Sequence, residues 1–310
     1  MVIQNIAAPS TVRVRRRVGR QRRSWIGWVL TAPFAVVFLA FLLIPLGYAF
    51  WMSLQSSSLI GGDRWVGADN YVKAMQDPLF LKGIVFVIGF TVVLVPVQML
   101  VSLTAALVLD TMTSRFSQAS RLVIFVPYAV PAVIGALMWG FLYSPDFGPL
   151  KDLFGAFGAD APNLLSSGNV FGALVNIVTW QWAGYYMIII YAALKGIDPT
   201  VYEAARLDGA NAWQIALRIK VPMVSSALVL VLVFAIIGTL QFFTEPQILK
   251  SVSGGSIDAA FTPNMYAYST AFSYGQFNYA LAISFVLGAV VFVGSAIFMT
   301  ATRKRSGMTS

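Results

Sequence analysis

Two groups of residues in this chain have types and spacings that could do chemistry. The first group lies within residues 198–222 and comprises Glu203, Ala204, Ala205, Asp208 and Gly209. Alanines leave a low-relief surface, and the acidic residues border it with charge that can fix the register of a contact. The chemistry that we expect there is close docking into a groove of another protein.

The second group combines amide and aromatic side chains in two apolar segments: Asn176, Trp180, Gln181, Tyr185 and Gln241. Asn176 and Trp180 are four residues apart, so they share one face of a helix. Aromatic faces pack on the C–H surfaces of sugars, and amides match their hydroxyls. We therefore expect a solute pathway here, with helix packing and interfacial aromatics as the alternative explanation.

Neither group is suited to making or breaking bonds. The chain has no histidine and no cysteine, and no carboxylates are paired within its apolar segments. An acid–base pair, a nucleophile with its base and a metal cluster all need such residues. We therefore expect no catalytic residue and no metal site, which argues against a membrane-embedded enzyme, the third function considered. A glycine-rich loop followed by Gly-Lys-Ser/Thr is also missing, so we expect no ATP and no other cofactor on this chain.

The composition places these groups in a membrane protein, because 58% of the residues are hydrophobic and 11% are charged. Six stretches without Asp, Glu, Lys or Arg are long enough to cross a bilayer as helices: residues 26–50, 84–108, 122–143, 171–194, 222–243 and 277–301. The fold class that we expect is an all-α membrane protein with six spanning helices. Residues 26–301 then form one transmembrane domain that includes the loop 195–222, between basic tails at 1–25 and 302–310.

The positions of Lys and Arg indicate the orientation in the membrane. Of the 21 such residues, 16 lie in the two tails and in the loops 110–121 and 195–222. We expect both termini and the loop 195–222 to be cytoplasmic. The net charge of +9 follows from this bias and indicates contact with membrane lipid, with no nucleic-acid partner. The outer segments 51–83, 144–172 and 244–276 are rich in turn-forming residues and predict turns and short surface helices.

The loop itself has helix signals at both ends. Asp198 is a good N-cap, with a proline following it at the first helical position. Gly209 can end this helix with a positive φ angle. Asn211 can cap a second helix together with Gln214, and we expect that helix to stop just before Pro222. An amphipathic helix lying on the inner leaflet is the alternative for this segment.

Within the apolar segments, prolines and glycines predict local geometry. Pro96, Pro127 and Pro131 are expected to kink their helices, because proline removes a backbone donor. Gly135, Gly184 and Gly288 are expected to permit close approach of neighbouring helices, with ordinary packing as the alternative for each residue.

The longest pattern begins at Glu203-Ala204-Ala205, continues after three residues with Gly209 and ends after nine more with Ile219, one residue and Val221-Pro222. It resembles the signature of permease subunits of binding-protein-dependent ABC importers. Four further segments are similar to the sugar and glycerol-phosphate branch of that family: Tyr202 to Ala210, Trp213-Gln214, Val66 to Tyr71 and Phe147 to Leu150. Trp213-Gln214 and the six-helix length resemble the first of the two permease subunits.

This resemblance implies the six-helix fold of type I importers in a prokaryotic cytoplasmic (inner) membrane. It implies three kinds of partner: a second permease subunit in a heterodimer, an ABC ATPase dimer that uses ATP and Mg, and an extracytoplasmic solute-binding protein. Glu203 would make a polar contact in an ATPase cleft, Ala204 and Ala205 would permit close packing, and Gly209 would supply the turn beside Asp208. The function so implied is import of a sugar or related polyol.

An ion-coupled secondary transporter is the alternative function. Such transporters usually carry ionisable residues at membrane depth. The six apolar stretches contain none, which argues against this alternative.

Overall fold

The structure is a computed structural model that describes residues 25–58, 62–112 and 115–303. The expected basic tails therefore lie almost entirely outside the described residues. The chain forms two units, with the boundary between Ala49 and Phe50.

The first unit contains one long helical stretch. It runs through α1 (Trp25–Phe38), the π-helix η1 (Leu39–Leu43) and α2 (Ile44–Ser53), which continues past the boundary of the unit. The stretch is long and apolar enough to cross a membrane. It corresponds to the first expected span, residues 26–50.

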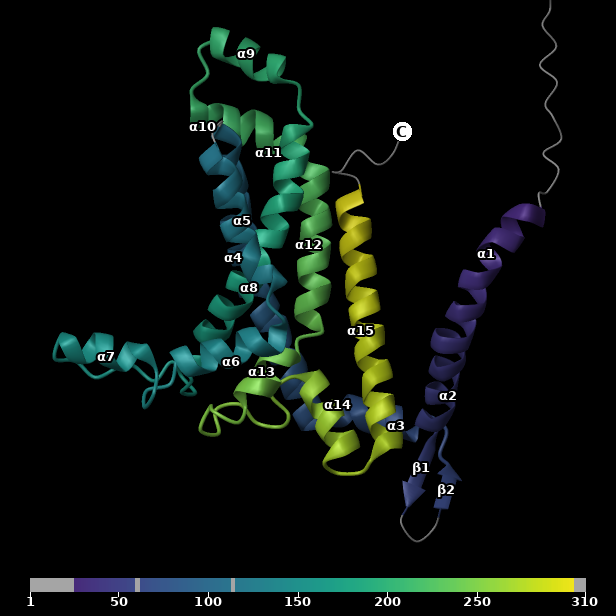
Figure 1. The fold of residues 1–310 in the computed structure, drawn as a ribbon. Helices are drawn as coiled ribbons and strands as arrows, with labels where there is room; N and C mark the ends of the chain where they lie inside the picture. The colour runs from purple at the N-terminus through teal and green to yellow at the C-terminus, as the bar shows by residue number, and fades with distance from the viewer. Residues whose placement is uncertain (1–24, 59–61, 113–114, 304–310) are drawn as a thin grey trace, which may run out of the picture. The chain divides into compact units, whose positions relative to one another are not determined.

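The second unit is built around four long helices: α4 (Pro78–Thr111), α8 (Val170–Lys195), α12 (Ser225–Leu240) and α15 (Phe277–Arg303). In Figure 1, α8 and α12 run between the end of the unit that carries α9–α11 and the end that carries α13 and α14. α4 packs against both α8 and α12, and α12 also packs against α15. The described residues contain five candidate spans, or six if one bent helix pair counts as a span, in agreement with the six expected.

That bent pair consists of α5 (Arg115–Ala129) and α6 (Ala132–Leu142), which meet at an angle of 96°. The kink expected at Pro131 is confirmed, and it divides the segment 122–143 into two helices, whereas Pro127 lies within α5. Pro131 has no N–H group and keeps the residue before it out of the helical region. The carbonyl of Val130 accepts a hydrogen bond from Gln181 Nε2 on α8 (3.3 Å), so a side chain satisfies this backbone group at the break.

Short elements fill the end opposite α9. They are the antiparallel hairpin β1 (Gln55–Ser58) and β2 (Gly62–Trp65), in which Gln55 pairs with Trp65, and the helices α3 (Asp69–Gln76), α7 (Pro149–Ala156), α13 (Thr244–Leu249) and α14 (Pro263–Phe272). The expectation of short surface helices is wrong for α14. Its residues Met265, Ser269 and Thr270 are buried, because α14 packs against α4 and α15.

Polar side chains of α4 bind the backbone of α8 inside the bundle. Gln98 Nε2 donates to the carbonyl of Val178 (3.2 Å), and Ser102 Oγ donates to that of Ala183 (3.0 Å). Both side chains are buried. Hydrogen bonds of this kind help to hold helices together where lipid offers no hydrophobic driving force between them.

The close approach expected at Gly184 is confirmed. A Cβ atom there would collide with the carbonyl oxygen of Ile124 and lie 2.9 Å from the Cα atom of Phe125, so the backbones of α8 and α5 meet at this glycine. The same expectation is wrong for Gly288, where a Cβ atom would have no neighbour within 4 Å in the described chain.

An aspartate caps α4 at the end opposite α9. Asp77 Oδ1 accepts from the backbone N–H of Leu79 (2.9 Å), and Oδ2 accepts from the hydroxyls of Tyr266 (2.6 Å) and Tyr279 (2.8 Å). Partial burial acts to raise the pKa of Asp77. The tyrosine and backbone hydrogen bonds outweigh burial and hold the pKa of this carboxyl below its ordinary value.

We predict that Gly184→Ala destabilises the chain by ~1–3 kcal/mol, because the added methyl group forces α5 away from α8. Gly172→Ala in the same helix is the matched control, since a Cβ atom there meets nothing within 4 Å. Thermal unfolding of both purified variants in detergent tests this. Equal melting temperatures for the two variants would contradict the prediction.

We also predict that Asp77 makes stability depend on pH. Its pKa is lower in the folded chain, so its stabilisation is complete above the unfolded value of about 3.9 and is lost as the pH falls through the folded value. Asp77→Asn should lower the melting temperature at pH 7. The difference in melting temperature between this variant and the unmodified chain should become smaller towards pH 3. Asp152→Asn, at an exposed site on α7, should leave the pH profile unchanged. If the difference in melting temperature between Asp77→Asn and the unmodified chain stayed constant with pH, Asp77 would not cause the pH dependence of stability.

Candidate functional site

The loop after α8 forms a helix, a sharp turn and a second helix, as the sequence predicts. Asp198 caps α9 (Pro199–Leu207) by accepting from the backbone N–H of Thr200 (2.9 Å), and these hydrogen bonds lower the pKa of Asp198. Gly209 has φ +83°, a backbone conformation that favours glycine. Asn211 and Gln214 form the expected capping box at the start of α10 (Ala212–Ile215), with two reciprocal bonds of 2.9 Å.

The second helix continues further than expected. It passes from α10 through the π-helix η2 (Ala216–Lys220) into α11 (Val221–Met223) and breaks at Val224, so the expected stop before Pro222 is wrong. The N–H of Val221 donates to the carbonyl of Ala216, five residues back. This wider turn accommodates the proline, which has no N–H to place in an α-helical pattern.

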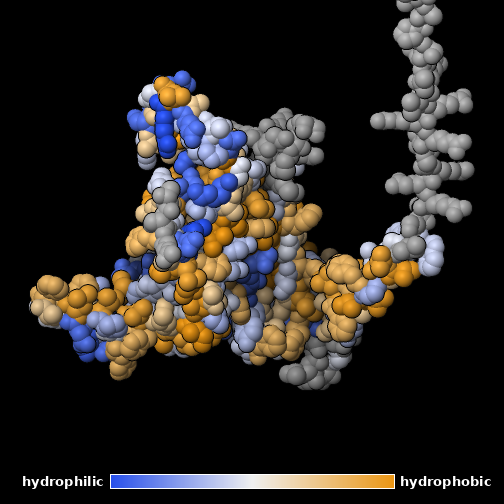
Figure 2. Space-filling model, turned by 45° about the horizontal axis from the view of Figure 1, so that its top comes forward, coloured by the Kyte–Doolittle hydropathy of each residue, from blue (hydrophilic) through white to orange (hydrophobic). Residues whose placement is uncertain are grey.

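The tip of the loop exposes both charged and apolar side chains. Glu203, Ala204 and Asp208 are exposed, while Ala205 is half-buried. Figure 2 shows hydrophilic residues gathered at this end of the unit. Exposed large apolar side chains also lie at this end: Leu207 (89%) and Trp213 (72%).

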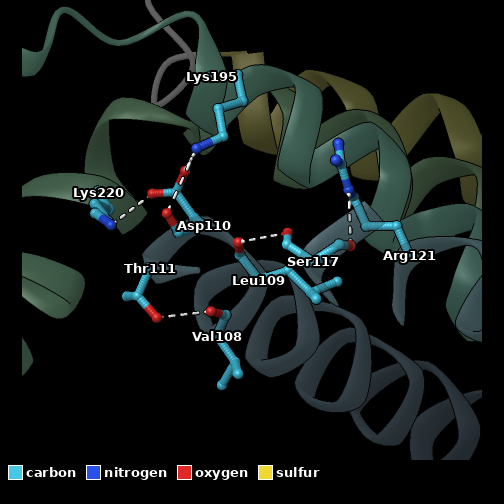
Figure 3. A network of polar contacts seen from close by, with 8 residues as sticks. All are labelled: Val108, Leu109, Asp110, Thr111, Ser117, Arg121, Lys195 and Lys220. Carbon is cyan, nitrogen blue, oxygen red and sulfur yellow. Dashed lines mark hydrogen bonds and ion pairs between the residues drawn. The ribbon is translucent and has the colours of Figure 1, made fainter. Parts of the chain in front are cut away.

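One buried carboxylate holds both ends of the loop (Figure 3). Asp110, the second-last residue of α4, binds Lys195 Nζ through Oδ1 (2.7 Å) and Lys220 Nζ through Oδ2 (2.5 Å). Lys195 is the last residue of α8, and Lys220 is the last residue of η2. The chain therefore leaves the helix bundle and returns to it at the same carboxylate.

Aromatic rings support this ion cluster. The ammonium of Lys220 lies 4.9 Å from the ring centre of Tyr202, the residue before Glu203. Lys195 and Arg121 both lie over the ring of Tyr191, at 5.3 and 4.8 Å. Such cation–π contacts strengthen when they are shielded from water, so α9 is tied to the cluster through Tyr202.

Asp110, Lys195 and Lys220 were not predicted to form a site. The two lysines served only to orient the chain, and Asp110 was expected in a loop. An acidic residue at the end of an apolar run, with lysines at both ends of a later loop, is the signal that was available.

The second candidate site is a cavity of about 550 Å³ inside the bundle. Its aromatic wall consists of Tyr128, Trp182, Tyr185 and Tyr186. Tyr128 and Tyr185 stack with ring centres 4.6 Å apart, and Tyr128 meets the edge of Trp182 at 5.4 Å. These aromatic side chains come from α5 and α8, and of the four only Tyr185 was expected on the solute pathway.

Polar groups from α4, α12, α13 and the turn between α12 and α13 also line the cavity: Gln98, Thr239, Gln241, Thr244 and Glu245. Gln98 is buried, and its Oε1 accepts no hydrogen bond from the described residues. Glu245 is also buried, with 6% of its surface exposed, although the sequence analysis placed it in an outer loop. Amide and hydroxyl groups such as those of Gln241 and Thr244 can bind hydroxyl groups of a solute.

The residues expected to form the pathway divide into two sets. Tyr185 and Gln241 line the cavity. Asn176, Trp180 and Gln181 do not belong to its lining and instead face α5 and α6. Asn176 donates to the hydroxyl of Tyr143 (2.6 Å), the ring of Trp180 lies against that of Trp139, and Gln181 binds the carbonyl of Val130.

No group of three or more His, Cys, Asp or Glu side chains that could hold a metal ion is found among residues 25–58, 62–112 and 115–303. The candidate site consists of the exposed loop from Asp198 to Gly209 and a cavity lined by aromatic and amide groups.

Known proteins are similar to this chain in sequence and in fold. A family described as "Binding-protein-dependent transport system inner membrane component" matches residues 98–304. The lactose transport system permease protein LacF of Rhizobium radiobacter is 30% identical over 283 residues, which cover 90% of this chain and 94% of that protein. The sn-glycerol-3-phosphate transport system permease protein UgpA of Salmonella choleraesuis is 30% identical over 275 residues, which cover 88% of this chain and 92% of that protein.

Among solved structures, a bacterial ABC transporter involved in the import of the acidic polysaccharide alginate has the same fold. Its TM-score is 0.80 at 21% identity, and the match covers 91% of this chain and 96% of that chain. The expected importer permease fold is confirmed. This chain belongs to the family of binding-protein-dependent transport system inner membrane components, and it is a multi-pass membrane permease.

Proposed function

We propose that this chain is one of the two permease subunits of an ATP-driven importer that moves a sugar or related polyol delivered by an extracytoplasmic binding protein. The names of its relatives, which transport lactose and sn-glycerol 3-phosphate, support this substrate class. The family is one of binding-protein-dependent systems, which argues against an ion-coupled secondary transporter.

The observation that carries the proposal is the capped and exposed loop from Asp198 to Gly209. A rigid helix that projects from the bundle is suited to transmitting a motion of a partner domain. In this proposal Glu203 and Asp208 make polar contacts in a cleft of the ATPase, and Ala204 and Ala205 allow the close approach. Leu207 adds an apolar contact that the sequence analysis did not include.

The residues of this chain indicate which functions the other subunits would supply. ATP and Mg would be bound by the paired ATPase subunits, and this chain would supply no cofactor site. Both termini and the loop would lie on the cytoplasmic side of the bacterial inner membrane, where the Lys and Arg bias places them. The second permease would complete the passage as a heterodimer.

The cavity is the proposed place of solute passage. Sugar rings present C–H faces to aromatic side chains such as Trp182 and Tyr185, and their hydroxyls can bind the exposed amide of Gln241. Tyr185 and Gln241, which were expected on the solute pathway, would contact the solute in this cavity. Asn176, Trp180 and Gln181 would have no contact with the solute, since they face α6 and the break at Val130.

The docking proposal predicts that Glu203→Lys together with Gly209→Val lowers recovery of the ATPase on the order of tenfold, since both a contact and the turn are lost. The measurement is purification through a tag on this chain, with mass spectrometry of the co-purified subunits. Asp152→Lys on α7 is the matched charge reversal and should leave recovery unchanged. Normal recovery and uptake in the double variant would refute docking at this loop.

The cavity proposal predicts that Gln241→Ala raises the KM for uptake several-fold, the effect of losing about 1 kcal/mol of hydrogen bonding. Asn176→Ala should leave the KM unchanged, because Asn176 does not line the cavity. Uptake of radiolabelled mono- and disaccharides and of glycerol 3-phosphate by cells that express each variant is the test. The reverse pattern, with Asn176→Ala alone raising the KM, would place the pathway between α8 and α6 instead.

A further inference from the structure

The ion cluster at Asp110 has a feature that a stabilising contact does not need. Its carboxylate is 5% exposed and pairs with two lysines that lie 25 positions apart, at the two ends of one loop. A buried ion pair is by itself weak evidence for stability, because desolvation offsets much of the attraction. Stabilisation alone therefore does not explain why one carboxylate on α4, that of Asp110, pairs with both Lys195 and Lys220.

The two arms of the cluster differ in their surroundings. The Lys220 side chain is 11% exposed and also contacts the ring of Tyr202, whereas the Lys195 side chain is 49% exposed. Lys220 thus connects Asp110 to α9, and Lys195 connects Asp110 to the end of α8. A displacement of α9 would act on Asp110 through Lys220 and on α8 through the loop that follows Lys195.

Asp110 also connects the loop to the cavity. Gln98, which lines the cavity, lies on the same helix α4, twelve residues before Asp110 and so roughly 18 Å away along the axis. Gln98 and Ser102 bind α8 carbonyls between these two points. A motion of Asp110 therefore reaches the cavity wall through a single helix that is hydrogen-bonded to its neighbour.

We propose that Asp110 is a positioning residue for transport, which transmits the motion of the docked loop to α4 and α8 through Lys220 and Lys195. This inference rests on the proposed docking of an ATPase at the loop. Asp110 touches neither solute nor nucleotide. The loop supplies the motion, and the Asp110 cluster determines that α4 and α8 move with it.

The test uses the whole transporter, purified through a tag on this chain and reconstituted in lipid nanodiscs. Because the sequence contains no cysteine, Gln241→Cys introduces one thiol at the cavity wall. The labelling rate of this thiol by a maleimide is compared before and after trapping with ATP, Mg²⁺ and vanadate. This readout requires no knowledge of the solute.

The main variant is Asp110→Asn with Lys220→Met, which removes the carboxylate without leaving the buried lysine unpaired. We expect it to retain the ATPase and to hydrolyse ATP. The trapping-induced change in labelling rate should fall on the order of tenfold, within the range of known coupling between sites. A full change in labelling rate would overturn the inference, because the motion would then reach the cavity without Asp110.

A second variant keeps the inference testable if the first does not fold. Lys195→Met removes only the half-exposed arm of the cluster, and we expect an intermediate loss of the labelling response. Asp258→Asn, which breaks the exposed pair with Lys82 (3.4 Å), is the control and should respond as the unmodified chain does. An unaltered response in Lys195→Met would also contradict the inference.

Failure of the proposed function gives a different result from failure of this inference. If the unmodified tagged chain recovers no ATPase, the docking proposal fails before any variant is made. If the ATPase is recovered and every Asp110-cluster variant responds normally, docking stands and only the role of Asp110 is lost.

Discussion

The charge of Asp110 ties both ends of the loop 195–222, the proposed docking loop, to the helix bundle. A carboxylate with little exposure requires compensation by cations, and the two that compensate it come from the ends of one loop. The position of α9 relative to the bundle is therefore defined by this ion cluster together with the contact between Lys220 and Tyr202. The neighbouring apolar core, with Leu109, Leu194 and Val224, closes the bundle beneath it.

The same helix is held by an aspartate at its other end. Asp77 caps α4 and binds Tyr266 and Tyr279, which are far away in the sequence. α4 thus carries an anionic residue at each end, outside the apolar middle of the helix. This arrangement keeps charge away from the lipid core while tying α4 to α14 and α15 at one end and to the docking loop at the other.

Between these ends, the bundle follows the rule that backbone polar groups inside a membrane require partners. The break at Val130 and Pro131 obeys this rule, because Gln181 donates to the exposed carbonyl. The break also turns α6 away from the direction of α5, and α6 then packs against α13. Tyr128 of α5 remains on the aromatic wall of the cavity, so the broken span helps to shape the place proposed for solute passage.

The sequence by itself determined the features that depend on neighbouring residues. Asp198, Gly209 and the Asn211–Gln214 pair produce the caps and the turn of the loop wherever that loop is placed, since cap and turn geometry is local. The apolar runs likewise determined the number of spans, because span length depends on bilayer thickness. The signature that starts at Glu203 was enough to indicate the family.

Only the tertiary structure decided which distant residues meet. Asp110 pairs with lysines 85 and 110 positions later, and no local pattern specifies such a partner. Helical spacing placed Asn176 and Trp180 on one face, but it could not say whether that face met a cavity or a neighbouring helix. Glu245 and α14 were assigned to an outer loop because their sequence is rich in turn formers, and they are buried because neighbouring helices cover them. Burial is a property of the whole packing arrangement, and for this reason it could not be obtained from the residues alone.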